Sequence, residues 1–321
     1  MNPLRLLPFL LISFLGCNQW PAHTKLSSSG DCSCIPSVSD DTSSAATYKT
    51  VRGALLGTRF KSLEALKSVI QIEYGDSMVR VHHCSNGREV TAVLATGTSQ
   101  GDLIKAMAHG TIWNRLRLLF RCPFAVMNRK DLQYVFYLSR WCPDLFGEGD
   151  LAFFDIAKSS VGNINTPELA FRNVRDSTEK GYLNSFNHMT SQAFITSCFS
   201  EEMADFIADA HERYRHPELI TGKFSEAEII DLEEGPVDNY VDLINNEWGQ
   251  ELGKQLKAKY SIGPETTWTP ELLANYLNDL QHYYSWAFQI GFKPFRPEDE
   301  AVLRFSNKID GFMKGRVTIH K

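Results

Sequence analysis

Helical periodicity in the second half of the chain constrains the fold more than any other sequence feature. From Phe186 to Ile290, apolar residues recur every three or four positions, which is the spacing of one buried face of an α-helix. The first helical stretch is expected to break near Ser200, because serine is a favoured N-cap of a new helix. Three stretches are therefore predicted to be helical: 186–215 with its break, 237–260 and 269–290.

The region before this helical part has a mixed pattern. Alternating runs at 78–83 and 89–96 flank Cys84-Ser85-Asn86-Gly87 and predict a β-hairpin. Helical spacing is also found around 62–71, from Gly101 to Leu119 and over 131–141. Pro294 and Pro297 are expected to close the regular structure.

These patterns predict an α+β fold that is mainly α. A small α+β region with the β-hairpin is assigned to residues 48–175, and a helical domain to residues 176–321. The remaining residues are interpreted as a signal peptide, 1–16, and a flexible spacer, 17–47.

The first residues have the layout of an export signal. Arg5 precedes an apolar core from Leu6 to Leu15, which is too short to span a bilayer. Phe14-Leu15-Gly16-Cys17 resembles a bacterial lipobox, although Phe14 stands where Leu is usual. The resemblance implies lipid on Cys17, which would hold the protein on the non-cytoplasmic side of a bacterial membrane, with inner or outer membrane unresolved.

Two other interpretations of the leader remain open. One is ordinary secretion with cleavage near Ala22, and the other is a buried helix formed by Leu6 to Leu15. The residues after Cys17 favour a tether, because 18–47 is rich in Ser, Thr, Asp and Pro and has little apolar material to offset the entropy of ordering.

Charge and cysteine content exclude some classes of protein. The formal net charge is −5 and becomes −6 once Arg5 leaves with the leader, which argues against a nucleic-acid partner. Seven cysteines are irregularly spaced, so a dense disulfide framework is not expected. Cys122 and Cys142 are expected either to pair or to remain free thiols.

The predicted helix 237–260 carries an unusual polar face. Asp242, Asn245, Asn246 and Gly249 are spaced by three and four residues and therefore share one side of the helix. Asp and Asn are poor residues for a helix interior, because their side chains compete for backbone groups. Gly249 and Gly253 would let a second helix approach closely. This face is expected to meet a neighbouring helix.

The expected neighbour is the stretch that carries His188 and Ala210-His211-Glu212. Two histidines this far apart cannot meet on one straight helix, but a hairpin at Ser200 would bring them together. His188, His211, Glu212 and Asp242 are then predicted to converge, as a metal site or as an acid and base pair.

Three motifs in this part of the chain resemble an uncharacterised bacterial helical domain family found in secreted proteins and lipoproteins. They are Asn184-Ser185-Phe186-Asn187-His188, Ala210-His211-Glu212, and Asp242-Leu243-Ile244-Asn245-Asn246 followed by Gly249, over about residues 182–256. The family pattern has Asp, Arg and His where this chain has Asn184, Asn187 and Ile244. The resemblance implies a site at these positions and assigns no reaction.

Two functions are consistent with these residues. The first is a non-catalytic, lipid-anchored envelope protein whose polar core is structural or binds a protein or glycan partner. The second is a hydrolase acting on an envelope glycan, peptide or lipid. Its predicted catalytic residues are His188, His211, Glu212, Asp242, Asn245 and Asn246, and a divalent metal, if used, would be held by His188, His211 and Asp242. A catalytic site should open onto a cleft, whereas a purely structural network should be sealed.

Overall fold

A computed structural model describes residues 70–85, 88–108, 111–166, 182–230, 236–288 and 290–314. The leader, Cys17 and the rest of the predicted spacer lie outside these residues. Among the helices of the described part, none has the length and apolar character that crossing a bilayer requires.

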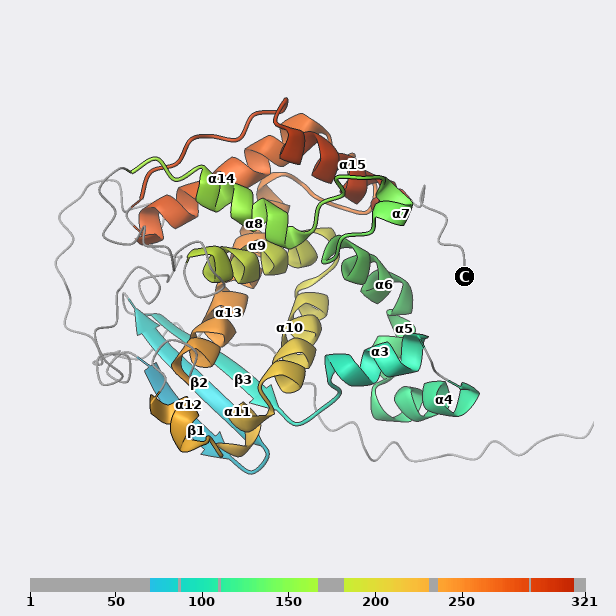
Figure 1. Ribbon diagram of the computed structural model, residues 1–321, viewed down its shortest axis with the longest axis vertical. Coiled ribbons are helices and arrows are strands. Elements are labelled where there is room, and N and C mark those ends of the chain that lie inside the picture. Colours follow the sequence, from blue (N-terminus) through green and yellow to red (C-terminus); the bar gives the residue numbers. More distant parts are fainter. Residues whose placement is uncertain are drawn as a thin grey trace, which may run out of the picture.

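The described chain is mainly helical with one small sheet, which confirms the predicted fold class (Figure 1). The strands are β1 (Ile70–Gly75), β2 (Met78–Ser85) and β3 (Arg88–Ala95). The helices of the first half are α3 (Gln100–Ala108), α4 (Ile112–Arg121), α5 (Pro123–Met127), α6 (Arg129–Leu138), α7 (Pro143–Phe146) and α8 (Phe153–Gly162). Those of the second half are α9 (Tyr182–Cys198), α10 (Glu201–Arg215), α11 (Pro217–Thr221), α12 (Glu226–Ile230), α13 (Pro236–Lys259), α14 (Pro270–Phe288) and α15 (Glu300–Met313).

The sheet is antiparallel, in the order β1-β2-β3. Alternation along β2 and β3 points one face inward, as expected for strands that are covered on one side. That face packs against α11 and the first turns of α13 in a small core made of Val79, Val81, Ala92, Leu94, Leu219, Ile220, Tyr240, Leu243 and Ile244. The predicted hairpin is confirmed as β2 and β3, and a third strand, β1, is added at its edge.

The helices α9 and α13 form the centre of the molecule and run parallel to each other. Their polar side chains pair with a constant offset in sequence: Asn184 with Asp242, His188 with Asn246, and Gln192 with Gln250. Because both members of each pair advance by four residues, about one helical turn, the two helices keep in step along this contact.

Two glycines allow this pair of helices to approach closely. A Cβ atom on Gly249 would lie 2.6 Å from the backbone oxygen of Met189, and one on Gly253 would lie 2.6 Å from the backbone oxygen of Ala193. Real side chains do not tolerate such contacts with backbone atoms. The predicted close approach of a helix at these glycines is therefore confirmed, and α9 is that helix.

The helix α10 returns alongside α9 in the opposite direction. Ser200 separates the two helices, and its hydroxyl accepts a hydrogen bond from the Met203 backbone N–H at 3.0 Å, as an N-cap does. The predicted break at Ser200 is confirmed. As a result the rings of His188 and His211 lie 6.5 Å apart, centroid to centroid.

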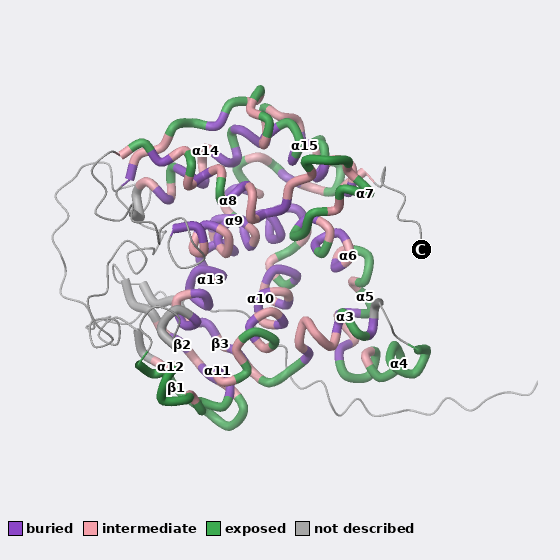
Figure 2. The backbone as a smooth tube through the Cα atoms, in the orientation of Figure 1, coloured by how far each residue is buried: buried purple, intermediate pink, exposed green. Residues whose placement is uncertain are grey.

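The remaining helices cover the other sides of α9, and purple buried segments meet there in Figure 2. The core that they share draws buried residues from α6, α8, α14 and α15. Lys308 on α15 is almost completely buried, and its ammonium group donates to Asp150 at 2.8 Å and to the backbone oxygens of Arg140 and Leu151. This buried ion pair attaches the last helix to the segment between α6 and α8.

Several expectations about the elements were wrong. Pro294 and Pro297 do not close the regular structure, because α15 follows them and buries Phe305 and Phe312. The predicted helical run from Gly101 to Leu119 is two helices, α3 and α4. Of the predicted helix around 62–71, only residues 70 and 71 are described, and they belong to strand β1. Of the two alternatives for Cys122 and Cys142, the structure has the second: both are free thiols.

We expect Gly249→Ala and Gly253→Ala each to lower the free energy of unfolding by about 1–3 kcal/mol, because the added methyl group pushes α13 away from α9. Chemical denaturation measures the change. Gly162→Ala in α8 is the matched control, since a Cβ there meets nothing within 4 Å. Equal stability of all three variants would contradict the close contact.

Candidate functional site

His188 stands at the centre of a chain of polar contacts between α9 and α13. Its Nδ1 lies 2.9 Å from Oδ1 of Asn246, and its Nε2 lies 3.4 Å from Oδ2 of Asp242. An amide oxygen only accepts hydrogen bonds, so Nδ1 carries the proton in this contact. The His188 side chain is thereby held at both ring nitrogens.

Glu212 and Asn184 occupy the two ends of this chain. The Asn246 side-chain N–H donates to Oε1 of Glu212 at 3.4 Å, and the Asn184 side-chain N–H donates to Oδ1 of Asp242 at 3.0 Å. The second carboxyl oxygen of Glu212, Oε2, is buried and has no hydrogen-bond partner among the described residues. A buried carboxyl group with one unpartnered oxygen is most stable when it is protonated.

His211 lies beside His188 on the neighbouring helix α10. Its Nδ1 is 3.2 Å from Oε1 of Gln100, at the start of α3. Because that amide oxygen only accepts, Nδ1–H donates to it, and the lone pair of the neutral ring then lies on Nε2.

Burial sets the protonation of the three titratable groups around His188. Burial raises the pKa of Glu212 to about 8, and the neighbouring Asp242 adds to the rise. Burial also raises the pKa of Asp242, against the opposing effects of His188, His216, Asn245 and Asn184. Burial, together with the nearby His188, lowers the pKa of His211 to about 4. At neutral pH the site therefore holds an uncharged imidazole next to a protonated carboxyl group.

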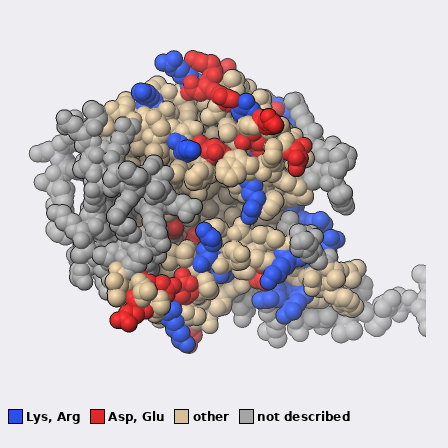
Figure 3. All heavy atoms as spheres, in the orientation of Figure 1, with Lys and Arg blue, Asp and Glu red and all other residues tan. Residues whose placement is uncertain are grey.

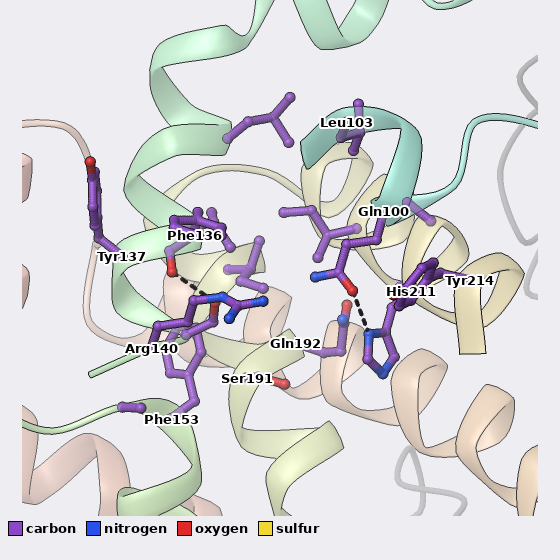
Figure 4. A pocket seen from close by; sticks show the side chains of 18 of the residues that line it. Gln100, Leu103, Phe136, Tyr137, Arg140, Phe153, Ser191, Gln192, His211 and Tyr214 are labelled. Carbon is purple, nitrogen blue, oxygen red and sulfur yellow. Dashed lines mark hydrogen bonds between the residues drawn. The ribbon is translucent and has the colours of Figure 1, made fainter. Parts of the chain in front are cut away.

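A pocket of about 840 Å³ opens above these residues. Figure 4 shows its walls: Gln100, Leu103 and His211 lie on one side, Phe136, Tyr137 and Arg140 lie on the other, and Gln192 and Ser191 lie between them. On the side of the polar chain, the pocket is lined by Asn187, His188, Ser191, Gln192, His211, Glu212 and Asn246. The polar network is therefore open on one side, as expected of a catalytic or binding site.

The lining of the pocket carries positive charge. Arg129, Arg140 and Arg215 all contribute to it, and Glu212 is the one acidic residue among the described residues that line it. The Arg140 guanidinium lies 4.8 Å from the ring centre of Phe136, which fixes its direction. Figure 3 shows a hollow in the middle of this face with Lys and Arg side chains near its rim. The surroundings of the pocket favour a negatively charged ligand.

The structure divides the predicted catalytic residues into two groups. His188, His211, Glu212 and Asn246 line the pocket. Asp242 and Asn245 are buried behind them and do not line it, so they can act only by positioning and charge. Of the departures from the family pattern, Asn187 lines the pocket, Asn184 binds Asp242, and Ile244 is buried in the core beside the sheet.

The predicted metal ligands His188, His211 and Asp242 do not form a metal site. Within the described part of the chain, no three His, Cys, Asp or Glu side chains are grouped so as to hold an ion. The reason is that both nitrogens of His188 are engaged by Asn246 and Asp242, while Nδ1 of His211 is turned toward Gln100. The geometry favours the acid and base alternative.

Sequence reasoning missed the residues that come from the first half of the chain. Gln100 and Arg140 reach the pocket from α3 and from the end of α6, and no spacing pattern connects them to His188. Arg215 could have been found, because it follows His211 by four residues and so shares its side of α10.

Comparison of the chain with protein families, with curated proteins and with solved structures finds no match. The resemblance of the three motifs to a bacterial helical domain family stays a prediction.

Glu212→Gln is expected to change how stability depends on pH. Because its pKa rises from 4.5 to about 8 on folding, Glu212 binds a proton in the folded state that the unfolded chain releases. Its contribution is complete below pH 4.5 and is lost as pH rises toward about 8. The glutamine variant should escape this loss and gain stability relative to wild type across that interval.

Denaturation midpoints measured at several pH values test this expectation. Glu265→Gln serves as the control, since Glu265 is exposed and does not line the pocket. Parallel stability curves for wild type and Glu212→Gln would rule out a buried protonated carboxyl group.

Proposed function

We propose that this pocket is the active site of a hydrolase that uses His211 and Glu212 as general base and general acid. The observation that carries the proposal is their joint presence in an open pocket. The neutral imidazole of His211 can accept a proton, and the protonated carboxyl group of Glu212 can donate one. Such a pair is suited to reactions in which water adds as a leaving group departs.

The roles follow from the hydrogen bonds. Nδ1–H of His211 is held by Gln100, so Nε2 is the atom that takes a proton from an attacking water. Glu212 then supplies a proton to the leaving group. Asn246 holds the Glu212 carboxyl in place, and His188 in turn holds Asn246. Asp242 supports His188 from behind.

The arginines define the class of substrate. Arg129, Arg140 and Arg215 can bind carboxylate or phosphate oxygens, which guanidinium groups contact in pairs. The apolar and aromatic lining, which includes Phe136, Trp141 and Phe153, would contact the uncharged remainder. The proposed substrate is an anionic molecule with an apolar or ring-bearing part.

A purely structural network is the alternative, and one observation favours it. Gln192 and Gln250 are both buried and bind each other at 3.2 Å, and this pair fixes the alignment of α9 and α13 without any reactive group. On this interpretation the polar residues would stabilise the helices, and substitutions at His211 would change stability alone.

His211→Gln and Glu212→Gln are each expected to lower kcat by about 10²- to 10⁴-fold, the usual contribution of a general base or acid. The measurement is turnover of a panel of chromogenic anionic esters, amides, phosphodiesters and glycosides. His282→Gln is the control, because His282 is exposed on α14 and does not line the pocket. Unchanged turnover in the first two variants would remove the proposal, and folding is checked by their denaturation midpoints.

We also propose, from the leader alone, that Cys17 carries lipid and that the hydrolase acts on the non-cytoplasmic side of a bacterial membrane. The support is the apolar core from Leu6 to Leu15, followed by Gly16-Cys17 and a polar stretch. An envelope location would make lipids, glycans and peptides accessible as substrates.

Cys17→Ala is expected to abolish incorporation of a radiolabelled fatty acid into the protein. The wild-type chain expressed in a bacterial host should incorporate the label. Cys142→Ala is the matched control, since Cys142 lies in the folded part and should leave labelling unchanged. Labelling that persists in Cys17→Ala would refute the anchor.

A further inference from the structure

The helix α4 has an exposed apolar face that no packing among the described residues covers. Ile112, Trp113 and Phe120 are 70%, 75% and 72% exposed, and none of the residues of the helix is buried. Leu116 and Leu119 lie on the same face and are also exposed. Exposed residues of α4 are green in Figure 2, at the edge of the molecule. An exposed apolar face of this kind marks a surface that binds something.

The opposite side of the helix faces the protein, where the half-buried Leu118 packs against the main core. The helix ends at Cys122, whose backbone N–H donates to the Leu118 oxygen at 2.7 Å. Thr111 caps the start of the helix by accepting from the Asn114 backbone N–H. The apolar face therefore points away from the core because the helix is fixed in that orientation.

Basic residues border the apolar face on both sides. Arg115 follows one edge, and Arg117 and Arg121 follow the other, when the residues are placed at 100° intervals around the helix. The helix contains no acidic residue, although the whole chain has a formal net charge of −5. Asp102 is the neighbouring carboxylate that acts on Arg121. Figure 3 shows Lys and Arg side chains gathered toward this side of the molecule.

We propose that α4 binds the surface of an anionic lipid bilayer, with its apolar face among the acyl chains and its arginines at the phosphate groups. A helix with Trp, Phe and Leu on one face and arginines on the other is typical of helices that lie in the membrane interface. The match of charge favours this occupant: an acidic protein would be repelled by an anionic membrane everywhere except at such a basic surface. This proposal does not depend on hydrolase activity or on lipid at Cys17.

The position of α4 next to the pocket gives the contact a functional consequence. The pocket walls from α3 and α6 precede and follow α4 and α5 in sequence, and Leu103, Ile104 and Arg129 line the pocket from these flanks. Seating α4 on a bilayer would bring this side of the pocket toward the lipid headgroups.

Quenching of tryptophan fluorescence by brominated lipids tests the proposal. The full chain is reconstituted into vesicles of phosphatidylcholine with or without phosphatidylglycerol, and the acyl chains of the lipid carry bromine. Trp113→Phe should remove most of the emission that the brominated lipid quenches in the anionic vesicles. Trp141→Phe is the matched control, because Trp141 is 60% exposed but belongs to the pocket rim, and it should leave the quenching unchanged.

A charge variant separates this contact from a tether at the N-terminus. Arg115→Glu with Arg117→Glu should lose the quenching of Trp113 whether or not a tether keeps the protein in the vesicle fraction, and vesicles without phosphatidylglycerol should also show less of it. Equal quenching in wild type and Trp113→Phe would overturn the proposal. A Trp113 that is unquenched in vesicles but changes emission with protein concentration would overturn it as well, and would show instead that α4 joins two copies of the chain.

Discussion

The close contact between α9 and α13 at Gly249 and Gly253 is the constraint on which the rest of the structure depends. Because α9 and α13 run parallel, the chain between them must return along their whole length. Here α10 makes most of that return, so it must run antiparallel to both. That path carries His211 and Glu212 back to the level of His188. The glycine contact thus decides which residues meet in the pocket.

The same packing determines the electrostatics of the site. The packed helices bury the Glu212 and Asp242 side chains, and burial is the main cause of the raised pKa of each. Asn184 and Asn246 supply hydrogen bonds that a buried carboxyl group needs. The cost of burying polar groups is offset only where such partners exist, which accounts for the asparagines in the middle of helices. Oε2 of Glu212 is one of the buried side-chain atoms that lack such a partner among the described residues, and it belongs to the residue proposed as the proton donor.

Much of the helical half and of the site's interior could be predicted from the sequence. The break at Ser200 and the polar face of α13 are local patterns, because helix capping and helical spacing depend on residues that are close together in sequence. Their outcome, the meeting of His188, Glu212 and Asn246, follows once the hairpin at Ser200 forms.

The rest of the pocket could not be predicted, because it depends on contacts between residues distant in sequence. Gln100 and Arg140 reach the site only through the packing of α3 and α6 on α9 and α10. The apolar spacing of Ile112, Leu116 and Leu119 pointed to a core, but the structure exposes these residues: periodicity shows that a helix has an apolar face and does not show what covers that face. The helix α15 was missed because Pro294 and Pro297 suggested an end, whereas they precede the helix and leave its turns intact.

The buried ammonium group of Lys308 has a consequence for synthesis of the protein. It contacts the backbone oxygens of Arg140 and Leu151 and the carboxylate of Asp150, next to the pocket wall that Arg140 provides. All residues of the pocket precede Lys308 in the chain, so a ribosome has already made every one of them before this contact can form. The wall acquires its anchor only when the last helix has left the exit tunnel.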